Sequence, residues 1–313
     1  MSVSRNEHTI AESCQVSGRG YWTGQHVRVV ISPAPVGTGV QLVRVDLPDQ
    51  PTCIASTSNR RDTQLRTIVQ NGHARFEMVE HLMAALYAME IDNCRVEIDG
   101  EEFPGLDGSS HAYVNALQHA GLIVQASVRR RLVIDRPIRV ERGNRWIQAT
   151  PLSPTKKSGT HFEYRLRFNT DTPIAAQTFS FTCTPSCFAR EVSRARTFVT
   201  KSQAESLRAQ GVAQHVTNQE LLVFDEHGPV DNKLRYQDEC ARHKTLDLIG
   251  DLSLTGLDII GSITSYRGGH SLNGLLAQRL VELAALQGMM GPESQSHTNQ
   301  ASSCPFESDR DAA

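Results

Sequence analysis

The chain lacks the features that mark membrane, secreted and nucleic-acid-binding proteins. No run among its 313 residues approaches the about 20 consecutive apolar residues that a membrane-spanning helix needs. Its first residues, MSVSRNEHTI, contain no apolar segment of the kind that signal peptides carry. The formal net charge is -2, whereas binding to nucleic-acid phosphates needs a basic face. We therefore expect a cytoplasmic protein with no transmembrane segment and no nucleic-acid partner.

Signatures of nucleotide cofactors and of common hydrolases are also absent. No P-loop or dinucleotide-binding glycine motif follows a predicted strand, and H-E-x-x-H does not occur. GHSLNG (269–274) resembles the turn that carries a nucleophilic serine, but Asn273 stands where that turn requires glycine. The seven cysteines are irregularly spaced, which is typical of free thiols in a reducing compartment. The one close pair, Cys183 and Cys187, has no second pair to complete a zinc site, and we interpret it as structural.

The residues that are present predict an α+β fold with two domains of similar plan. Apolar residues make up 39% and charged residues 21%, which is typical of a folded globular chain long enough for two domains. Strand patterns are followed by helical patterns twice along the chain. The predicted elements are strands over 8–56, a helix at 77–89, a strand at 94–100, a helix at 110–121, strands over 131–182, helices near 185–192, 201–210 and 239–253, a strand at 258–266 and a helix at 271–288.

The boundary between the domains is placed at the segment ASVRRR (126–131). We interpret this segment as a linker, because strand patterning restarts after it. The N-terminal domain then covers 1–127 and the C-terminal domain 128–290. The remaining residues, 291–313, are polar and aperiodic, which predicts a disordered tail.

One predicted helix, 239–253, combines an apolar stripe with charged residues. Within RHKTLDLIGD (242–251), His243, Asp247 and Asp251 are four residues apart and share one face of the helix. A histidine and an aspartate one turn apart can bind the same metal ion. Taken alone, this spacing is more often a solvated polar stripe.

Two further histidines supply the missing parts of a metal site. An open catalytic zinc site needs a third protein ligand. His81 in MVEHLMAAL (78–86) and His270 in YRGGHSLNG (266–274) are each isolated among apolar or glycine residues. A lone histidine on an apolar helix is usually a satisfied core residue. Glu80 directly precedes His81, however, and such a pair is costly to bury, so function is the better explanation.

Five segments together resemble a known family. MVEHLMAAL, FPGLDGSS (103–110), SRARTF (193–198), RHKTLDLIGD and GGHSLN, in this order and spacing, are similar to the UDP-3-O-acyl-N-acetylglucosamine deacetylases (LpxC family). The likeness covers about residues 5–285. The resemblance implies two domains of the same plan, each a mixed sheet layered with helices, with the active site between them. It also implies a zinc-dependent hydrolase that catalyses the committed step of lipid A biosynthesis, acting on a UDP-linked acylated glucosamine and releasing acetate. Separately, we expect the chain to be a monomer.

The resemblance also assigns the metal ligands and the groups that move protons. The zinc ligands fall on His81, His243 and Asp247, and Fe²⁺ would fit the same set. The general base falls on Glu80 and the general acid on His270.

The remaining roles implied by the resemblance concern the substrate. Asp251 would hydrogen-bond His270 and keep its imidazolium charged. Lys244 and Thr197 would face the substrate and the oxyanion, and Phe198 would contact the substrate. An insert at about 198–232 would shape the passage for the acyl chain.

Three positions depart from the family pattern. Trp22 in GYWTG (20–24) replaces the usual histidine, Glu77-Met78 replaces Ser-Thr before Val79, and His215-Val216 replaces Gly-Gly in the insert. We expect His215 and Val216 to narrow the acyl passage and to add a polar ring near its wall. The acyl preference should then shift toward a shorter or differently placed chain.

Two alternatives stay open beside the main interpretation. The chain could be a non-catalytic homologue that binds an acylated nucleotide sugar, although a binding module has no use for a base beside a metal ligand. It could also deacetylate another acylated amino sugar.

Overall fold

The computed structural model describes residues 4–63, 65–154, 159–168 and 172–288. The predicted disordered tail, 291–313, lies outside the described residues. Among the helices of these ranges, none has the length and apolar character needed to cross a membrane.

The first half of the chain forms a five-stranded mixed sheet with the order β2-β3-β9-β4-β5. In β3, HVRVVISP, buried aliphatic residues alternate with more exposed ones, as expected for a sheet with one face against the core. The strands are β2 (Cys14–Arg19), β3 (His26–Pro33), β9 (Cys94–Ile98), β4 (Val40–Arg44) and β5 (Thr52–Ile54). A small antiparallel sheet beside it contains β6 (Arg60–Arg61), β7 (Ile68–Asn71) and β8 (Ala74–Glu77).

The second half forms a six-stranded sheet with the order β12-β13-β19-β14-β15. A short strand, β11, pairs in parallel with β19. The strands are β11 (Arg131–Val133), β12 (Ile138–Arg142), β13 (Arg145–Thr150), β19 (Asp258–Tyr266), β14 (Thr160–Leu166) and β15 (Gln177–Thr182).

The two sheets share one plan. Each has a central strand, β9 or β19, that is antiparallel to one neighbour and parallel to the other. In each half, a helix precedes this central strand and another follows it. The α+β class with repeated architecture is therefore confirmed, while the domain boundary at 127/128 stays a prediction.

The interpretation of 126–131 as a linker is wrong for all but Arg129 and Arg130, since the rest of the segment lies in strands. Strand β10 (Leu122–Val128) pairs with β1 (Asn6–Ile10) in an antiparallel ribbon. LIVQASV is a strand pattern, whereas the run of arginines that follows it favours a linker.

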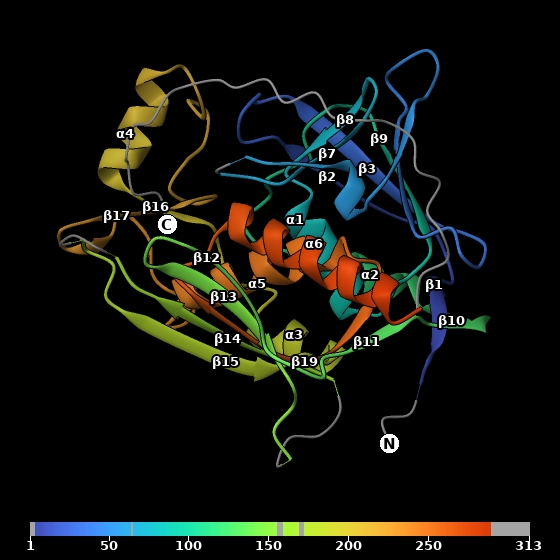
Figure 1. Cartoon of the computed structure of the whole chain (residues 1–313). Helices are drawn as coiled ribbons and strands as arrows, with labels where there is room; N and C mark the ends of the chain where they lie inside the picture. Colours follow the sequence, from blue (N-terminus) through green and yellow to red (C-terminus); the bar gives the residue numbers. More distant parts are fainter. Residues whose placement is uncertain (1–3, 64, 155–158, 169–171, 289–313) are drawn as a thin grey trace.

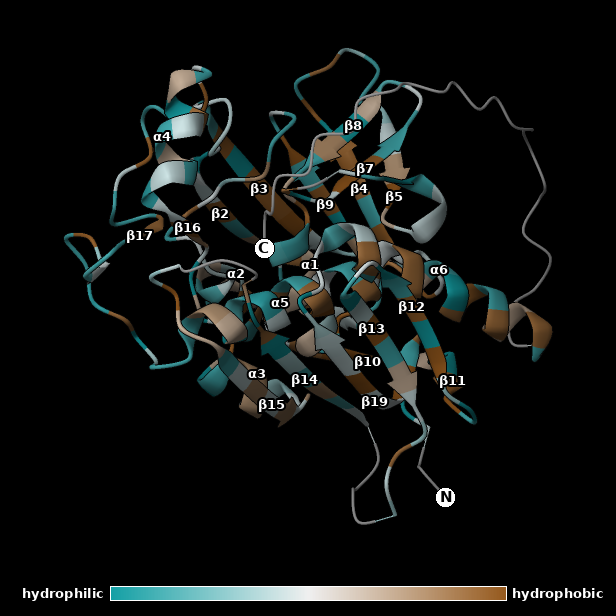
Figure 2. Ribbon diagram, turned by 60° about the vertical axis from the view of Figure 1, so that its left-hand side comes forward, coloured by the Kyte–Doolittle hydropathy of each residue, from teal (hydrophilic) through white to brown (hydrophobic). Residues whose placement is uncertain are grey.

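The helices lie between the two sheets, as Figures 1 and 2 show for α1, α5 and α6. The helix α5 and the strand β19 have the predicted bounds. The first helix begins later than predicted, because Met78 has a left-handed backbone (φ 60°) that cannot continue a helix. The helices are α1 (Glu80–Ala88), α2 (His111–Ala120), α3 (Pro185–Glu191), α4 (Lys201–Ala209), α5 (Glu239–Ser253) and α6 (His270–Leu286), with a 3₁₀ turn η1 (Thr57–Asn59).

The predicted insert forms a separate small unit at the edge of the molecule. Its strands β16 (Phe198–Thr200), β17 (Leu222–Asp225) and β18 (Gly228–Pro229) make a sheet of their own, which α4 flanks. Thr200 caps α4 through a reciprocal pair of hydrogen bonds with Gln203. Figure 2 shows α4 standing apart from both main sheets.

Candidate functional site

The helix α5 carries charged side chains in the centre of the molecule. Of its residues only Arg242 is not buried, and the helix packs against α1, α6 and the second sheet. Asp238 occupies its N-cap position, but its side chain makes no capping hydrogen bond and instead pairs with Arg242 at 2.6 Å. The mixture of apolar and charged residues in RHKTLDLIGD is therefore not a solvated stripe. Its residues are enclosed by α1, α6 and the second sheet.

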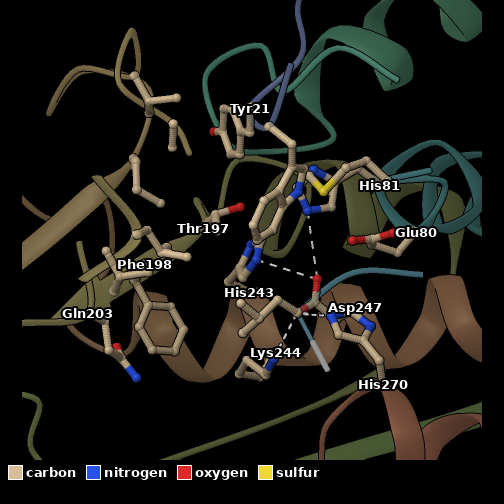
Figure 3. Close-up of a pocket in the computed structure, with 18 of the residues that line it drawn as sticks. Tyr21, Glu80, His81, Thr197, Phe198, Gln203, His243, Lys244, Asp247 and His270 are labelled. Carbon is tan, nitrogen blue, oxygen red and sulfur yellow. Dashed lines mark hydrogen bonds and ion pairs between the residues drawn. The ribbon is translucent and has the colours of Figure 1, made fainter. Parts of the chain in front are cut away.

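The three predicted metal ligands come together. Atoms of His81, His243 and Asp247 that can bind a metal lie within 4.8 Å of one another, and all three residues are buried. The Oδ1 atom of Asp247 is 3.4 Å from Nε2 of His243 and 3.7 Å from Nε2 of His81. Figure 3 shows both imidazoles directed at this carboxylate, with Glu80 and His270 beside it.

Two details of this cluster fit a metal ion. Oδ1 of Asp247 is buried and has no hydrogen-bond partner within the described chain, which is rare unless such an oxygen binds an ion. Nδ1 of His243 lies 3.1 Å from the carbonyl of Ala195, and a carbonyl can only accept. The proton therefore sits on Nδ1, and Nε2 keeps its lone pair for a metal. Burial lowers the pKa of His243 to about 4, so its ring is neutral.

Glu80 is the first residue of α1 and is buried beside the cluster. Its Oε2 accepts a hydrogen bond from the backbone N–H of Thr67 at 3.0 Å. Burial raises the pKa of Glu80, and this effect exceeds the opposing influence of His270 and His81. A carboxylate with a raised pKa has more affinity for a proton, which suits a general base.

His270 begins α6 on the other side of Asp247. The expected hydrogen bond to Asp251 is present, with Nδ1 2.9 Å from Oδ2. Burial lowers the pKa of His270, but the carboxylates of Asp251, Asp247 and Glu80 outweigh it and raise the pKa to about 9. The ring is therefore protonated at neutral pH.

Lys244, Thr197 and Phe198 all line the same pocket as the cluster. The Lys244 ammonium donates to Oδ2 of Asp247 at 3.0 Å, and although burial lowers its pKa, Asp247 raises it overall. The hydroxyl of Thr197 donates to the carbonyl of Gly108 at 3.0 Å. The ring of Phe198 meets that of His243 edge-on, with centroids 6.1 Å apart.

The pocket has a volume of about 370 Å³ and two chemically different ends. The polar end is formed by the cluster of His81, His243 and Asp247 together with Glu80 and His270. The apolar end lies against the insert and is lined by Val199, Leu207, Ala213, Val216 and Leu221.

The departures at Trp22, Glu77 and Met78 meet at one side of this pocket. Trp22 and Met78 both line it. The guanidinium of Arg66 lies 4.2 Å from the centre of the Trp22 ring and donates to Glu77 at 2.7 Å. This wall is therefore held together by a cation–π contact and an ion pair.

The expectation that His215 adds a polar ring to the acyl passage is wrong. Val216 lines the pocket, but the His215 ring contacts the GYWTG turn, where its Nε2 donates to the carbonyl of Gly20 at 2.7 Å. Nearby, the Tyr21 hydroxyl donates to the carbonyl of Glu220 at 2.5 Å. His215 therefore fastens the insert to the first half of the chain.

The sequence-based predictions assign no role to several residues that the structure places at the site. Thr67 lies against both predicted acid–base groups. A buried ion pair between Arg196 and Glu239 (2.8 Å) joins the SRARTF segment to the start of α5. Arg196 lies within SRARTF and Asn273 within GGHSLN, whereas Thr67 lies outside the five segments that carry the resemblance. Asn273 donates to Asp251 at 2.9 Å.

Known proteins match nearly the whole chain. A family model described as UDP-3-O-acyl N-acetylglycosamine deacetylase matches residues 7–282. The UDP-3-O-acyl-N-acetylglucosamine deacetylase of Anaeromyxobacter sp. (strain Fw109-5) is 37% identical over 278 residues, 88% of each chain. The proteins of the same name from Anaeromyxobacter dehalogenans (strain 2CP-C) and Shewanella loihica (strain ATCC BAA-1088 / PV-4) are 36% and 35% identical, over 89% and 88% of this chain and 88% and 89% of theirs.

Proposed function

This chain belongs to the UDP-3-O-acyl N-acetylglycosamine deacetylase family, and on that premise we propose that it hydrolyses the N-acetyl group of UDP-3-O-acyl-N-acetylglucosamine. The products are acetate and the free amine of the UDP-linked acylated glucosamine. The observation that carries this proposal is the buried His81–His243–Asp247 cluster, which opens on a pocket that also holds Glu80 and His270.

The metal that we propose is zinc, held by His81, His243 and Asp247. Two imidazoles and one carboxylate are a ligand set of open zinc sites, and Fe²⁺ would fit the same donors. When bound, such an ion would lower the pKa of water toward about 7 and polarise the acetamide carbonyl. The unpartnered Oδ1 of Asp247 and the free Nε2 of His243 support this assignment.

Glu80 and His270 would divide the proton transfers between them. Ionised Glu80 takes a proton from the water that attacks the acetamide carbon. Protonated His270 then gives a proton to the nitrogen as the C–N bond breaks, so that a neutral amine leaves. Asp251 supports this role because its carboxylate holds the imidazolium in place and in its charged form.

Thr197, Lys244 and Phe198 would act on the substrate. The Thr197 hydroxyl would turn from the Gly108 carbonyl to donate to the developing oxyanion. Lys244 places a positive charge at the same end of the pocket, where it favours that oxyanion. The apolar end of the pocket would hold the acyl chain, with Phe198 between the two ends.

We further propose a monomer in the cytoplasm. The six cysteines within the described residues are free, which suits a reducing compartment. Light scattering of the purified protein during gel filtration would measure the mass, and a stable dimer would contradict the first part.

Acetate release from UDP-3-O-acyl-N-acetylglucosamine tests the function directly. We expect the purified, metal-loaded protein to release acetate and Glu80→Gln to release almost none while it still binds the substrate. A wild-type protein that binds this substrate without turnover would instead support a non-catalytic homologue. Turnover of a different acylated amino sugar alone would support the other alternative.

A further inference from the structure

Thr67 is a fully buried residue that contacts three parts of the site at once. It directly precedes β7, and its backbone N–H donates to the Glu80 carboxylate at 3.0 Å. Its carbonyl accepts from the N–H of Val79, the N-cap residue of α1, at 3.4 Å. Its hydroxyl donates to Oδ1 of Asp251 and lies 3.2 Å from Nδ1 of His270.

We propose that Thr67 is a positioning residue that holds the general base and the general acid in a fixed relation to each other. This inference rests on the proposed function, since it assumes that Glu80 and His270 move protons in one reaction. Glu80 begins α1 and His270 begins α6, so the two residues come from opposite halves of the chain. Thr67 joins them through its own backbone and side chain.

The Thr67 hydroxyl acts on His270 through Asp251. This carboxylate is fully buried, and its Oδ2 accepts from both His270 and Asn273, each at 2.9 Å. The other oxygen, Oδ1, accepts from Thr67. Three donors therefore fix the rotation of the carboxylate, which in turn fixes the imidazole ring.

The side-chain type also suits this role. Threonine is branched at Cβ, which restricts its first side-chain torsion and keeps the hydroxyl in one direction. Serine could make the same hydrogen bond but would hold it less firmly. Valine has nearly the same shape and lacks the donor. Thr67→Ser should therefore weaken the hydrogen bond to Asp251, and Thr67→Val should remove it.

The experiment compares kcat and KM for acetate release in metal-loaded Thr67→Val and Thr67→Ser. Hydrogen-bond partners of metal-binding residues contribute about 10–100-fold, and Thr67 supports an acid–base group in the same indirect way. We expect Thr67→Val to lower kcat by about that factor, with KM and metal content unchanged, and Thr67→Ser to recover most of the loss. Thr9→Val is the matched control, because Thr9 is also buried and donates its hydroxyl to a carbonyl, that of Asn93, away from the pocket.

A second measurement does not depend on turnover. The ring N–H proton of His270 that points at Asp251 can be followed by proton NMR and assigned by its loss in His270→Ala. We expect Thr67→Val to shift this resonance, or to broaden it by faster exchange with water, and Thr9→Val to leave it unchanged. If Thr67→Val does not fold, Thr67→Ala removes the same hydroxyl without adding bulk.

The outcomes separate this inference from the proposed function. Wild-type kcat and an unshifted His270 resonance in a folded, hydroxyl-free variant would overturn the role of Thr67 while leaving the deacetylase intact. A wild-type protein that releases no acetate would overturn the function, and the inference with it. A larger effect on KM than on kcat would also overturn it, because positioning of the acid–base groups acts on the chemical step.

Discussion

Gly250 on α5 lies directly against the backbone carbonyl of Glu80 on α1. A Cβ atom at Gly250 would stand 2.1 Å from that oxygen, far inside van der Waals contact. The absence of a side chain therefore lets the two helices approach closely. Since His81 follows Glu80, and His243 and Asp247 lie on α5, this approach also sets the distance between the proposed metal ligands of the two helices.

Gly250→Ala should separate these helices and weaken metal binding. The added methyl group meets backbone, which cannot move aside as a flexible side chain can. We expect the free energy of unfolding to fall by about 1–3 kcal/mol and metal content to fall with it, as measured by denaturation and elemental analysis. Gly269→Ala is the control, because nothing lies within 4 Å of a Cβ atom there. Full metal content in Gly250→Ala would contradict this view of the helix contact.

Metal content tests the ligand set itself. We expect about one equivalent of divalent metal per chain in the purified, tag-free protein, and far less in His81→Ala and in His243→Ala. His8→Ala, which removes another buried histidine, should keep its metal. Unchanged metal in the first two variants would rule out the assignment, and the identity of the metal found would decide between zinc and iron.

The pH dependence of kcat/KM should be bell-shaped. On the proposed mechanism, activity needs ionised Glu80, whose pKa burial raises above its ordinary value of 4.5, so the acid limb should lie above that pH. Activity also needs protonated His270, whose pKa is raised to about 9, so the rate should fall as the pH rises through that value. In Asp251→Asn the leading cause that raises the His270 pKa is removed, and the alkaline limb should move to lower pH. An alkaline limb that does not move would assign it to another group.

Substitution of Val216 and substitution of His215 should affect the acyl preference differently. Val216 lines the apolar end of the pocket, so Val216→Gly should enlarge it and raise kcat/KM for longer acyl chains relative to shorter ones. His215 fastens the insert to Gly20 instead, so His215→Gly should raise KM for all chain lengths by a similar factor. A series of substrates with increasing acyl length measures both. Identical profiles for the two variants would contradict the different placement of their side chains.

Much of the fold could be predicted because it depends on local periodicity. The helix at 239–253 and the strand at 258–266 have the bounds that their apolar patterns predict. The four-residue spacing of His243 and Asp247 brings two ligand groups onto one helix face wherever that helix lies. The pairing of β10 with β1 could not be predicted, because the two strands are more than a hundred residues apart and a local sequence pattern does not indicate which distant strand is the partner.

The sequence by itself determined which residues have the chemistry for a metal-dependent hydrolase: Glu80 beside His81, the ligand pair on α5, and an isolated His270. Only the tertiary structure decided which other residues complete the site. Thr67 reaches Asp251 across the helix layer, Gly250 admits the α1 backbone, and His215 turns away from the passage. The physical reason is that hydrogen bonds and close contacts act over a few ångströms, and these partners are brought within that range only when the two halves pack.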